Sequence, residues 1–308
     1  MRIFVAGHKG MVGSALVQAL EKRGHGPGDL LLRSRSELDL RSREQVQAFF
    51  ESERPEHVYL AAAKVGGIQA NMNAPATFLF DNLMIQCNII DCAARTGTKV
   101  LCFLGSSCIY PRECPQPMKE EYLLTGALEP TNEGYALAKI AGLRMAQYYQ
   151  KEFGMRCVNP MPCNLYGPGD SFDPVNSHVL SALVRKFVDA ADRRLATVTI
   201  WGTGKARREF LHVEDLADAV MLLIDRWHQA DIINVGSGTD VTIEELARMI
   251  ARATGYAGEI QFDSSRPDGM PRKCLDVSRI AALGFTPRVD LAAGIAQMIH
   301  QYRQLQAG

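Results

Sequence analysis

The chain has 308 residues, of which 47% are hydrophobic and 22% are charged, as is ordinary for a globular protein of one large domain or two. Its 34 basic and 34 acidic residues cancel, so the composition favours neither a nucleic acid nor an anionic membrane as partner. No apolar run approaches the ~20 residues that span a bilayer. The first residues lead straight into a short apolar strand, so we expect a cytoplasmic protein without a leader peptide.

Short apolar runs alternate with amphipathic segments of helical period through the first half of the chain. The expected strands cover residues 2–7, 29–34, 57–63, 99–105 and part of 155–167. The expected helices cover residues 11–24, about 42–53, 75–94 and 135–154. This order predicts an α/β fold, a Rossmann-type doubly wound parallel sheet with helices on both faces.

The pattern changes after Gly167, where a turn-rich loop begins. A helix, a strand at 198–202, a strand or helix region at 207–227 and an apolar segment at 232–238 follow, then a helix at 242–255 and a last helix near the C-terminus. We expect a smaller mixed α/β C-terminal substrate domain here. The predicted division is 1–166 plus about 209–236 for the cofactor domain, and about 167–208 plus 237–308 for the substrate domain.

The eight cysteines contain no C-x-x-C pair, so the spacing of a zinc site is absent. A chain of this length needs no disulfide bonds to fold, and we expect none and no metal. Most of the thiols read as packing residues. Only Cys108 and Cys163 lie where chemistry is plausible, after the fourth and within the fifth strand segment.

Glycines at positions 7, 10 and 13 separate the first strand from the first helix. Glycine there permits a tight turn and lets the backbone approach a pyrophosphate at the helix N-terminus. The spacing is G-x-x-G-x-x-G, and a purely structural turn is the alternative. Its position at the start of a βαβ unit favours a dinucleotide site.

The end of the second strand discriminates between the two nicotinamide cofactors. An NAD site usually places an acidic residue there for the ribose hydroxyls. This chain has Arg33 and Arg35, whose guanidinium groups can bind a 2′-phosphate, so NADPH is favoured. Glu37 and Asp39 lie close by and count against this interpretation, as does the possibility that both arginines are solvated surface charges.

A tyrosine and a lysine, Tyr135 and Lys139, share one face of a predicted helix because they are four residues apart. A tyrosine with a free pKa of ~10 is a weak acid-base group near neutral pH, and a nearby ammonium lowers that pKa. Ser106 lies at the end of the fourth strand segment. Together with the glycine loop, these three residues are a strong signal of a catalytic site beside the cofactor.

Several segments, spread along nearly the whole chain, resemble the extended short-chain dehydrogenase/reductase family of nucleotide-sugar enzymes. They include "AGHKGMVGSA", "FLGSSCIYP", "LEPTNEGYALAKIAG", "NLYGPGDSFDP", "REFLHVEDLADA" and "RPDGMPRKCLDVSR". The likeness is greatest to members that epimerise C3 and C5 of GDP-4-keto-6-deoxy-D-mannose and then reduce C4 with NADPH. Relatives pair two long helices across a two-fold axis, which implies a homodimer through residues 78–94 and 135–149.

The resemblance implies a role for each of five catalytic residues. Ser106, Tyr135 and Lys139 form the reductive triad, in which Tyr135 protonates the C4 oxygen and Lys139 lowers the pKa of Tyr135 and holds the nicotinamide ribose. Cys108 is the base of the epimerisation and His178 the acid. A thiol can serve as a base where a positive neighbour or a polar site lowers its pKa, and the alternative for Cys108 is a packed strand-end cysteine.

The resemblance also implies binding positions. We expect the cofactor at Gly7, His8, Lys9, Gly10, Met11, Val12, Gly13, Arg33, Arg35, Asp39, Leu40, Leu104, Gly105, Ser106, Ser107, Lys139, Pro162, Cys163, Asn164, Leu165 and His178. We expect the GDP-sugar at Lys186, Trp201, Arg208 and Asp276. Arg208 has independent support, because a guanidinium after a glycine-rich turn can bind a diphosphate with two hydrogen bonds.

Two positions depart from the expected family pattern. Gly134 stands before the tyrosine where a proline is expected, and Cys163 stands where a threonine is expected. We expect Gly134 to loosen the loop before Tyr135 and Cys163 to change the packing at the nicotinamide. Neither substitution removes a proton donor or acceptor from the expected chemistry.

Three other functions remain open on the sequence. A nucleotide-sugar 4-epimerase is expected to carry an acidic residue after the second strand, and a 4,6-dehydratase an acidic pair where this chain reads "SSCIY". A non-catalytic NADPH-sensing regulator often lacks the tyrosine or the lysine, and both are present here.

Overall fold

The computed structural model describes residues 1–173, 177–266 and 268–307. Its main sheet has six parallel strands in the order β2-β1-β3-β4-β5-β9. The strands are β1 (Ile3–Ala6), β2 (Leu30–Leu31), β3 (His57–Leu60), β4 (Val100–Phe103), β5 (Arg156–Pro162) and β9 (Ile232–Val235). The predicted Rossmann-type parallel sheet is therefore confirmed.

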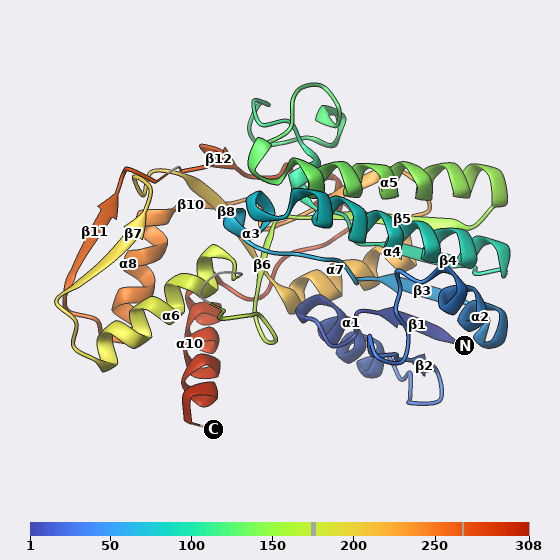
Figure 1. Ribbon diagram of the computed structural model, residues 1–308, viewed down its shortest axis with the longest axis horizontal. Coiled ribbons are helices and arrows are strands. Elements are labelled where there is room, and N and C mark those ends of the chain that lie inside the picture. The colour runs from blue at the N-terminus through green and yellow to red at the C-terminus, as the bar shows by residue number, and fades with distance from the viewer. Residues whose placement is uncertain (174–176, 267, 308) are drawn as a thin grey trace.

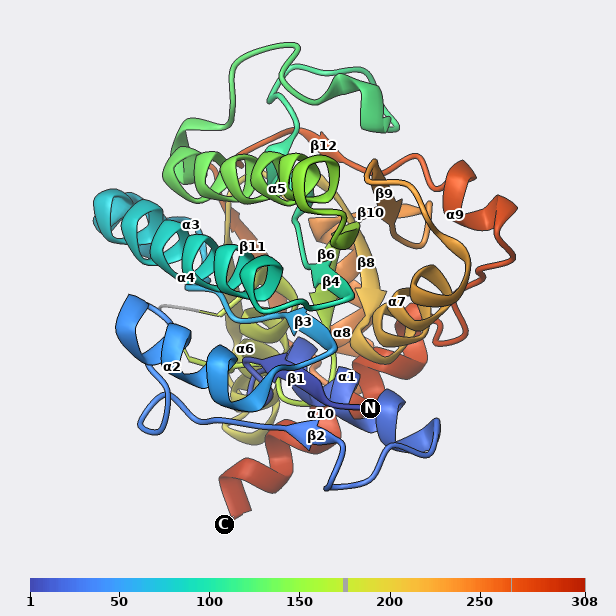
Figure 2. The same ribbon diagram turned by 90° about the vertical axis from the view of Figure 1, so that its right-hand side faces the viewer.

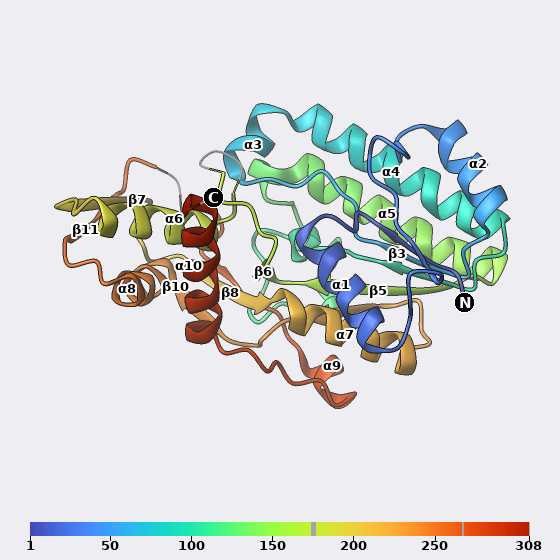
Figure 3. The same ribbon diagram turned by 90° about the horizontal axis from the view of Figure 1, so that it is seen from below.

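Helices cover both faces of this sheet (Figures 1 and 3). One face carries α1 (Met11–Lys22) and α7 (Val213–Arg226), and the other carries α2 (Arg43–Glu53), α4 (Pro75–Arg95) and α5 (Glu133–Phe153). Pro75 occupies the first turn of α4, where its missing N–H costs no hydrogen bond. The long helices α4 and α5 lie side by side on the outside of the sheet (Figure 2).

The strand order reverses beside β1, because the chain passes from β1 to β2 on one side and then returns to β3 on the other. In open parallel sheets the crevice at such a reversal, beyond the carboxyl ends of the strands, is the ligand site. Three of the predicted loops leave from this edge: Gly7 follows β1, Leu104 follows β4, and Cys163 follows β5.

A smaller mixed region lies at one end of the molecule, on the left in Figure 1. Strand β8 (Arg207–His212) pairs antiparallel with β10 (Asp240–Thr242) and parallel with β12 (Arg272–Lys273) and β6 (Asn164–Tyr166). A second pair joins β7 (Thr197–Trp201) to β11 (Glu259–Asp263) in parallel. The helices of this region are α6 (Val179–Asp192), α8 (Ile243–Thr254) and α10 (Leu291–Ala307).

Two clusters of buried side chains accompany these two regions. The larger lies around the six-stranded sheet, and the smaller packs α6, α8 and α10 against β7 and β8. Met270, Leu275, Ile280 and Phe285 from the last part of the chain pack in the larger cluster. These four residues were expected in the substrate domain, so the division into a cofactor domain and a substrate domain stays a prediction.

Some elements were not expected from the sequence. Helices α3 (Ile68–Asn73) and α9 (Ser278–Ala282) are only six and five residues long, and short 3-10 turns cover Ser107–Ile109, Glu120–Tyr122 and Pro130–Asn132. The second strand keeps only two of its six expected residues, so Arg33 and Arg35 lie in the loop after it. Within the described residues, no helix has the length and apolar character to cross a bilayer.

Candidate active site

The loop between β1 and α1 leaves backbone N–H groups available to an anion. Gly10 is the N-cap of α1 and offers no side-chain hydrogen bond to the first turn. Gly7 has φ of +86°, and a Cβ added at Gly13 would lie 2.1 Å from the Gly7 carbonyl oxygen. The Nδ1 atom of His8 is buried without a hydrogen-bond partner among the described residues. A tightly closed glycine loop with unpaired polar groups fits a dinucleotide pyrophosphate.

The two arginines of the loop after β2 differ in their contacts. Arg33 donates to Glu53 Oε1 at 2.9 Å and lies over the ring of Phe49. Arg35 is exposed, and the described part of the chain gives its side chain no hydrogen bond or ion pair. Of the two predicted phosphate ligands, only Arg35 therefore has a guanidinium that is free to bind one.

The acidic residues of the same loop already have partners. The carboxylate of Glu37 accepts from the backbone N–H of Ser34 at 2.7 Å. Asp39 accepts from Arg41 Nη2 at 2.8 Å, and the hydrogen bonds from Arg41 lower the pKa of Asp39 to about 2. These contacts weaken the argument that the two acids bind ribose hydroxyls in the manner of an NAD site.

The reductive triad comes together where β4 meets α5. Ser106 follows β4 and precedes the short turn 107–109, while Tyr135 and Lys139 project from the first two turns of α5. A hydrogen bond links Ser106 to the Tyr135 hydroxyl, and Lys139 Nζ lies 5.9 Å from the centre of the Tyr135 ring. Lys139 Nζ donates to the Leu104 carbonyl oxygen at 2.7 Å.

The expected lowering of the Tyr135 pKa by Lys139 is not what this structure has. Burial raises the pKa of Tyr135, the charge of Cys108 raises it further, and the hydrogen bond with Ser106 opposes both. Burial also lowers the pKa of Lys139 to about 8. The Lys139 ammonium is directed to the Leu104 carbonyl rather than to the phenol oxygen, which explains the difference from the expectation.

Cys108 has the polar surroundings that a basic thiol needs. Its sulfur accepts from Lys273 Nζ at 3.2 Å and from Asn132 Nδ2 at 3.3 Å. Burial would raise the pKa of Cys108, but the Lys273 charge and hydrogen bonds from Ser106, Lys273 and Asn132 outweigh it, so the pKa is lowered. The alternative of a packed, inert cysteine does not describe this environment.

The other thiols differ from Cys108. Burial raises the pKa of Cys163 well above its ordinary value, and burial likewise raises the pKa of Cys157 and Cys274 to about 12. All eight cysteines are free. The chemistry that was plausible for both Cys108 and Cys163 is thus confined by environment to Cys108.

His178, the predicted acid, stands immediately before α6 and is exposed. Burial raises the pKa of its neighbour Asp170, and the hydrogen bond from Ser181 and the charge of His178 partly oppose that rise. No contact of the described residues joins His178 to Cys108, and residues 174–176, just before it, lie outside the described part of the chain. The structure therefore brings together four of the five predicted catalytic residues.

The four predicted substrate residues fall into separate groups. Lys186 Nζ donates to the Thr199 carbonyl at 3.0 Å and lies 5.9 Å from the centre of the Trp201 ring, which is 57% exposed. Arg208 donates to the Asp268 carbonyl oxygen at 3.2 Å. Asp276 accepts from the Ser278 N–H at 2.9 Å. Within the described ranges, no hydrogen bond or ion pair joins these groups to one another.

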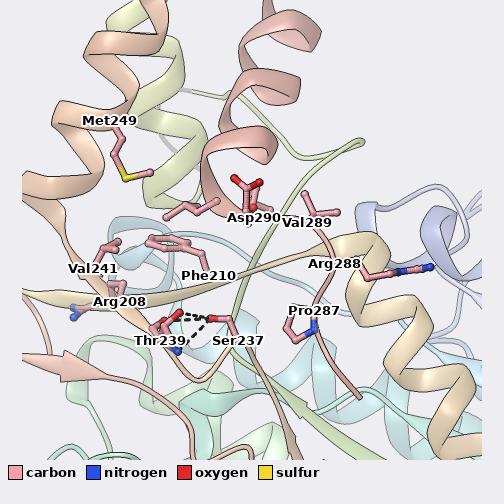
Figure 4. Close-up of a pocket in the computed structure, with 12 residues that line it drawn as sticks. Arg208, Phe210, Ser237, Thr239, Val241, Met249, Pro287, Arg288, Val289 and Asp290 are labelled. Carbon is pink, nitrogen blue, oxygen red and sulfur yellow. Dashed lines mark hydrogen bonds between the residues drawn. The ribbon is translucent and has the colours of Figure 1, made fainter. Parts of the chain in front are cut away.

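A cavity of about 440 Å³ opens beside β8 (Figure 4). Phe210, Val241 and Met249 form its apolar wall, while Arg208 and Asp290 add charge at its edges. Neither Cys108 nor any member of the reductive triad lines it. The cavity is therefore separate from the cysteine and tyrosine chemistry, although Arg208 borders both.

Comparison with known proteins identifies the group to which this site belongs. Residues 3–236 match the NAD dependent epimerase/dehydratase family. The chain belongs to this family. The matched residues include the whole six-stranded parallel sheet, the glycine loop and the Ser106–Tyr135–Lys139 arrangement.

Within the epimerase/dehydratase family, the chain is similar to curated proteins over almost its whole length. It is 51% identical to the putative GDP-L-fucose synthase 2 of Arabidopsis thaliana over 98% of this chain and 91% of that protein. It is 48% identical to the GDP-L-fucose synthase of Escherichia coli (strain K12), covering 99% and 97% of the two chains.

Among solved structures of similar fold is a GDP-mannoheptose C4 reductase from Campylobacter jejuni with NADP bound. It superimposes with a TM-score of 0.88 at 36% identity, and the match covers 98% of each chain. The alignment extends over the cofactor region and the smaller region alike.

Three residues of this epimerase/dehydratase family member were missed from the sequence. Lys273 and Asn132 both contact the Cys108 sulfur. The guanidinium of Arg266 lies 5.1 Å from the centre of the Trp201 ring. Asn132 lies only three positions before Tyr135, so its proximity to the site could have been inferred. Lys273 lies in the segment "RPDGMPRKCLDVSR", but no period or spacing in the sequence relates it to Cys108, which is 165 positions away.

Gly134 does not lie in the loop where it was expected. Gly134 belongs to the first turn of α5 rather than to a loop. A Cβ added there would lie 2.8 Å from the carbonyl oxygen of Pro75, the first residue of α4. Glycine thus permits close contact between the N-terminal ends of α4 and α5.

Proposed function

We propose that this protein makes GDP-L-fucose by epimerising C3 and C5 of GDP-4-keto-6-deoxy-D-mannose and then reducing C4 with NADPH. It is a bifunctional NADPH-dependent oxidoreductase with epimerase activity. Identity of 48% to 51% with GDP-L-fucose synthases over nearly the full chain supports this assignment. NADP in a solved relative, together with the unpaired Arg35, supports NADPH as the cofactor.

The observation that carries the proposal is the environment of Cys108. A C4 reductase needs a hydride donor and a proton donor, which the Ser106–Tyr135–Lys139 arrangement can provide. It needs no thiolate. A sulfur that accepts from Lys273 and Asn132 within 3.3 Å, next to this triad, adds the base that an epimerase requires.

The epimerisation uses the acidity that a ketone gives to its neighbours. Removing a proton beside the C4 ketone leaves an enolate, whose oxygen the hydroxyl of Ser106 stabilises by hydrogen bonding. Inverting the carbon needs a base on one face of the sugar and an acid on the other. Cys108 removes the proton, and His178 delivers one to the opposite face.

The reduction uses the buried tyrosine. When bound, NADPH supplies the hydride for C4. Tyr135 donates its hydroxyl proton to the C4 oxygen, which Ser106 orients. A raised pKa keeps the Tyr135 hydroxyl protonated and ready to donate. The Lys139 ammonium binds the nicotinamide ribose of the cofactor.

The GDP part of the substrate is bound by the smaller region. Trp201 offers an exposed ring for stacking, and Lys186 lies beside that ring. Arg208 binds the diphosphate through charge-assisted hydrogen bonds. Asp276 is assigned to the GDP-sugar from the resemblance.

Two further properties belong to the proposal. Helices α4 and α5 expose Phe80, Leu137 and Tyr148 at 60%, 44% and 64%, which suits a homodimer formed through these helices. Eight free cysteines suit the reducing cytoplasm, where we place the enzyme.

The test is to supply purified protein with GDP-4-keto-6-deoxy-D-mannose and NADPH and to identify the product by NMR. We expect stoichiometric NADPH oxidation and GDP-L-fucose. A 6-deoxy sugar that keeps the original C3 and C5 configuration would instead identify a plain C4 reductase. A 4-epimerase or a 4,6-dehydratase acts on a sugar that still carries its C4 hydroxyl, so failure to oxidise NADPH with the 4-keto sugar would point to one of these instead.

A further inference from the structure

Cys108 is paired with a cation that comes from a distant part of the chain. Lys273 Nζ lies 3.2 Å from the Cys108 sulfur, although the two residues are 165 positions apart. Among the described residues Lys273 forms no ion pair with a carboxylate within 4 Å, and its ammonium contacts the Cys108 sulfur instead. Asn132 Nδ2 donates to the same sulfur at 3.3 Å.

Both neighbours of Lys273 are fixed, which holds its backbone in place. Arg272 forms an ion pair with Asp240, whose carboxylate also pairs with Arg207. On the other side, the N–H of Cys274 donates to Gln116 Oε1 at 3.0 Å. Strand β12 consists only of Arg272 and Lys273, so these contacts determine where the ammonium can reach.

Strand pairing then directs Lys273 toward the site. Lys273 is the register partner of Arg208 in the parallel pairing of β12 with β8. Partners in a parallel pair project to the same face of a sheet. Arg208 is close enough to Cys108 for the sulfur's charge to act on its pKa, which agrees with both side chains facing the thiol.

Four titratable side chains surround the Cys108 sulfur from three elements. Tyr135 and Lys139 face it from α5, Arg208 from β8, and Lys273 from β12. Lys139 donates its hydrogen bond to the Leu104 carbonyl oxygen. Arg208 donates to the carbonyl oxygens of Arg207 and Asp268. Of the three cations, only Lys273 makes a hydrogen bond to the sulfur within the described structure.

We propose that Lys273 is a positioning residue of the epimerisation, whose ammonium holds the Cys108 sulfur in the ionised form that removes a proton from the sugar. The proposal rests on the proposed function only for what the thiolate does next. In that step the carbon–hydrogen bond breaks, its electron pair moves into the enolate, and the proton forms the S–H bond of Cys108. After His178 has protonated the opposite face, the thiol releases its proton to water and Lys273 again faces a thiolate.

The test uses Lys273→Met, which keeps the length of the side chain and removes its charge. Cys108 is alkylated with iodoacetamide across about pH 5 to 9, without substrate, and its modification is followed by peptide mass spectrometry. An opposite charge at this distance shifts a pKa by about 1–3 units. We therefore expect the midpoint for Cys108 to rise by at least about one unit, with roughly tenfold slower alkylation on the acid side.

Two further variants make the result specific. Lys273→Arg keeps the charge and should restore most of the pH dependence of Cys108 alkylation. Lys205→Met removes an exposed lysine from the loop between β7 and β8 and should leave that pH dependence unchanged. Binding of NADP by titration reports whether each variant is folded. If Lys273→Met does not fold, Lys273→Gln serves in its place.

An unchanged alkylation profile in the folded, uncharged variant would overturn the proposal. A shift without rescue by Lys273→Arg would also overturn it, because the effect would then be structural rather than electrostatic. With substrate in D₂O, we expect Lys273→Met to slow exchange at C3 and C5 in the same pH range, while NADP binding stays intact. Failure of the unmodified enzyme to act on the GDP-4-keto sugar would refute the proposed function and leave the alkylation result to decide the pairing alone.

Discussion

Replacing Arg35 by alanine tests how the chain selects its cofactor. The structure leaves the Arg35 guanidinium exposed and unpaired within the described residues, whereas Arg33 pairs with Glu53 at 2.9 Å. The change therefore removes a guanidinium that is available to bind the 2′-phosphate, without breaking a hydrogen bond or ion pair of the described residues. We expect Arg35→Ala to weaken NADPH and to leave both NADH binding and the fold unchanged.

The size of the effect follows from the number of hydrogen bonds at stake. A hydrogen bond to a charged group contributes about 1.5–3 kcal/mol, which corresponds to roughly 10- to 150-fold in affinity. The site is exposed, so solvent and salt screen the interaction and the lower half of that range is expected at physiological ionic strength. Arg33→Ala is the matched control. It removes a partly exposed ion pair worth about 0–1 kcal/mol and should change NADPH affinity less than Arg35→Ala does.

Isothermal titration with NADP and NAD measures both affinities for each variant, and repeating it at higher salt tests the electrostatic origin. We expect the NADP affinity of the unmodified protein to fall with salt and that of Arg35→Ala to fall less steeply. Equal losses for the two cofactors on Arg35→Ala would refute the assignment of this loop to the 2′-phosphate. A larger effect at Arg33 would show that the Glu53 pair opens to receive the cofactor.

Two other consequences can be checked independently. Gly13→Ala places a Cβ 2.1 Å from the Gly7 carbonyl oxygen, so we expect a lower Tm and loss of NADP binding, whereas Gly10→Ala meets only that oxygen at 3.4 Å and should keep its Tm in differential scanning fluorimetry. The apolar side chains exposed on α4 and α5 predict a homodimer, so light scattering at micromolar concentration should give twice the chain mass of 34.0 kDa and Phe80→Glu should reduce it, while a monomer for the unmodified protein would contradict the assignment.

Local patterns in the sequence were sufficient for the parts of the site that depend on one element. Tyr135 and Lys139 share a helix face because α5 is regular over their separation. The glycine loop was recognisable because the close approach of Gly13 to Gly7 requires glycine whatever the rest of the chain does. These features follow from backbone sterics and helical period, which act over a few residues.

Contacts between distant segments could not be read in the same way. Lys273 reaches Cys108 from a two-residue strand, which is too short to show a period in the sequence. Arg33 and Arg35 look equivalent in the sequence, and only the position of Glu53 at the end of α2 distinguishes them. The direction of the Tyr135 pKa shift was missed because it depends on burial, which is set by the whole fold.

Deuterium incorporation from D₂O into the 4-keto sugar tests most directly whether one site carries both epimerisation and reduction. Tyr135→Phe should exchange the C3 and C5 protons with solvent while failing to oxidise NADPH. Cys108→Ser should lose that exchange by about 10²–10⁴-fold, because a serine hydroxyl is far harder to ionise than a thiol, and should keep NADP binding. Exchange by Cys108→Ser as fast as by the unmodified enzyme would contradict the account, since the base would then lie elsewhere.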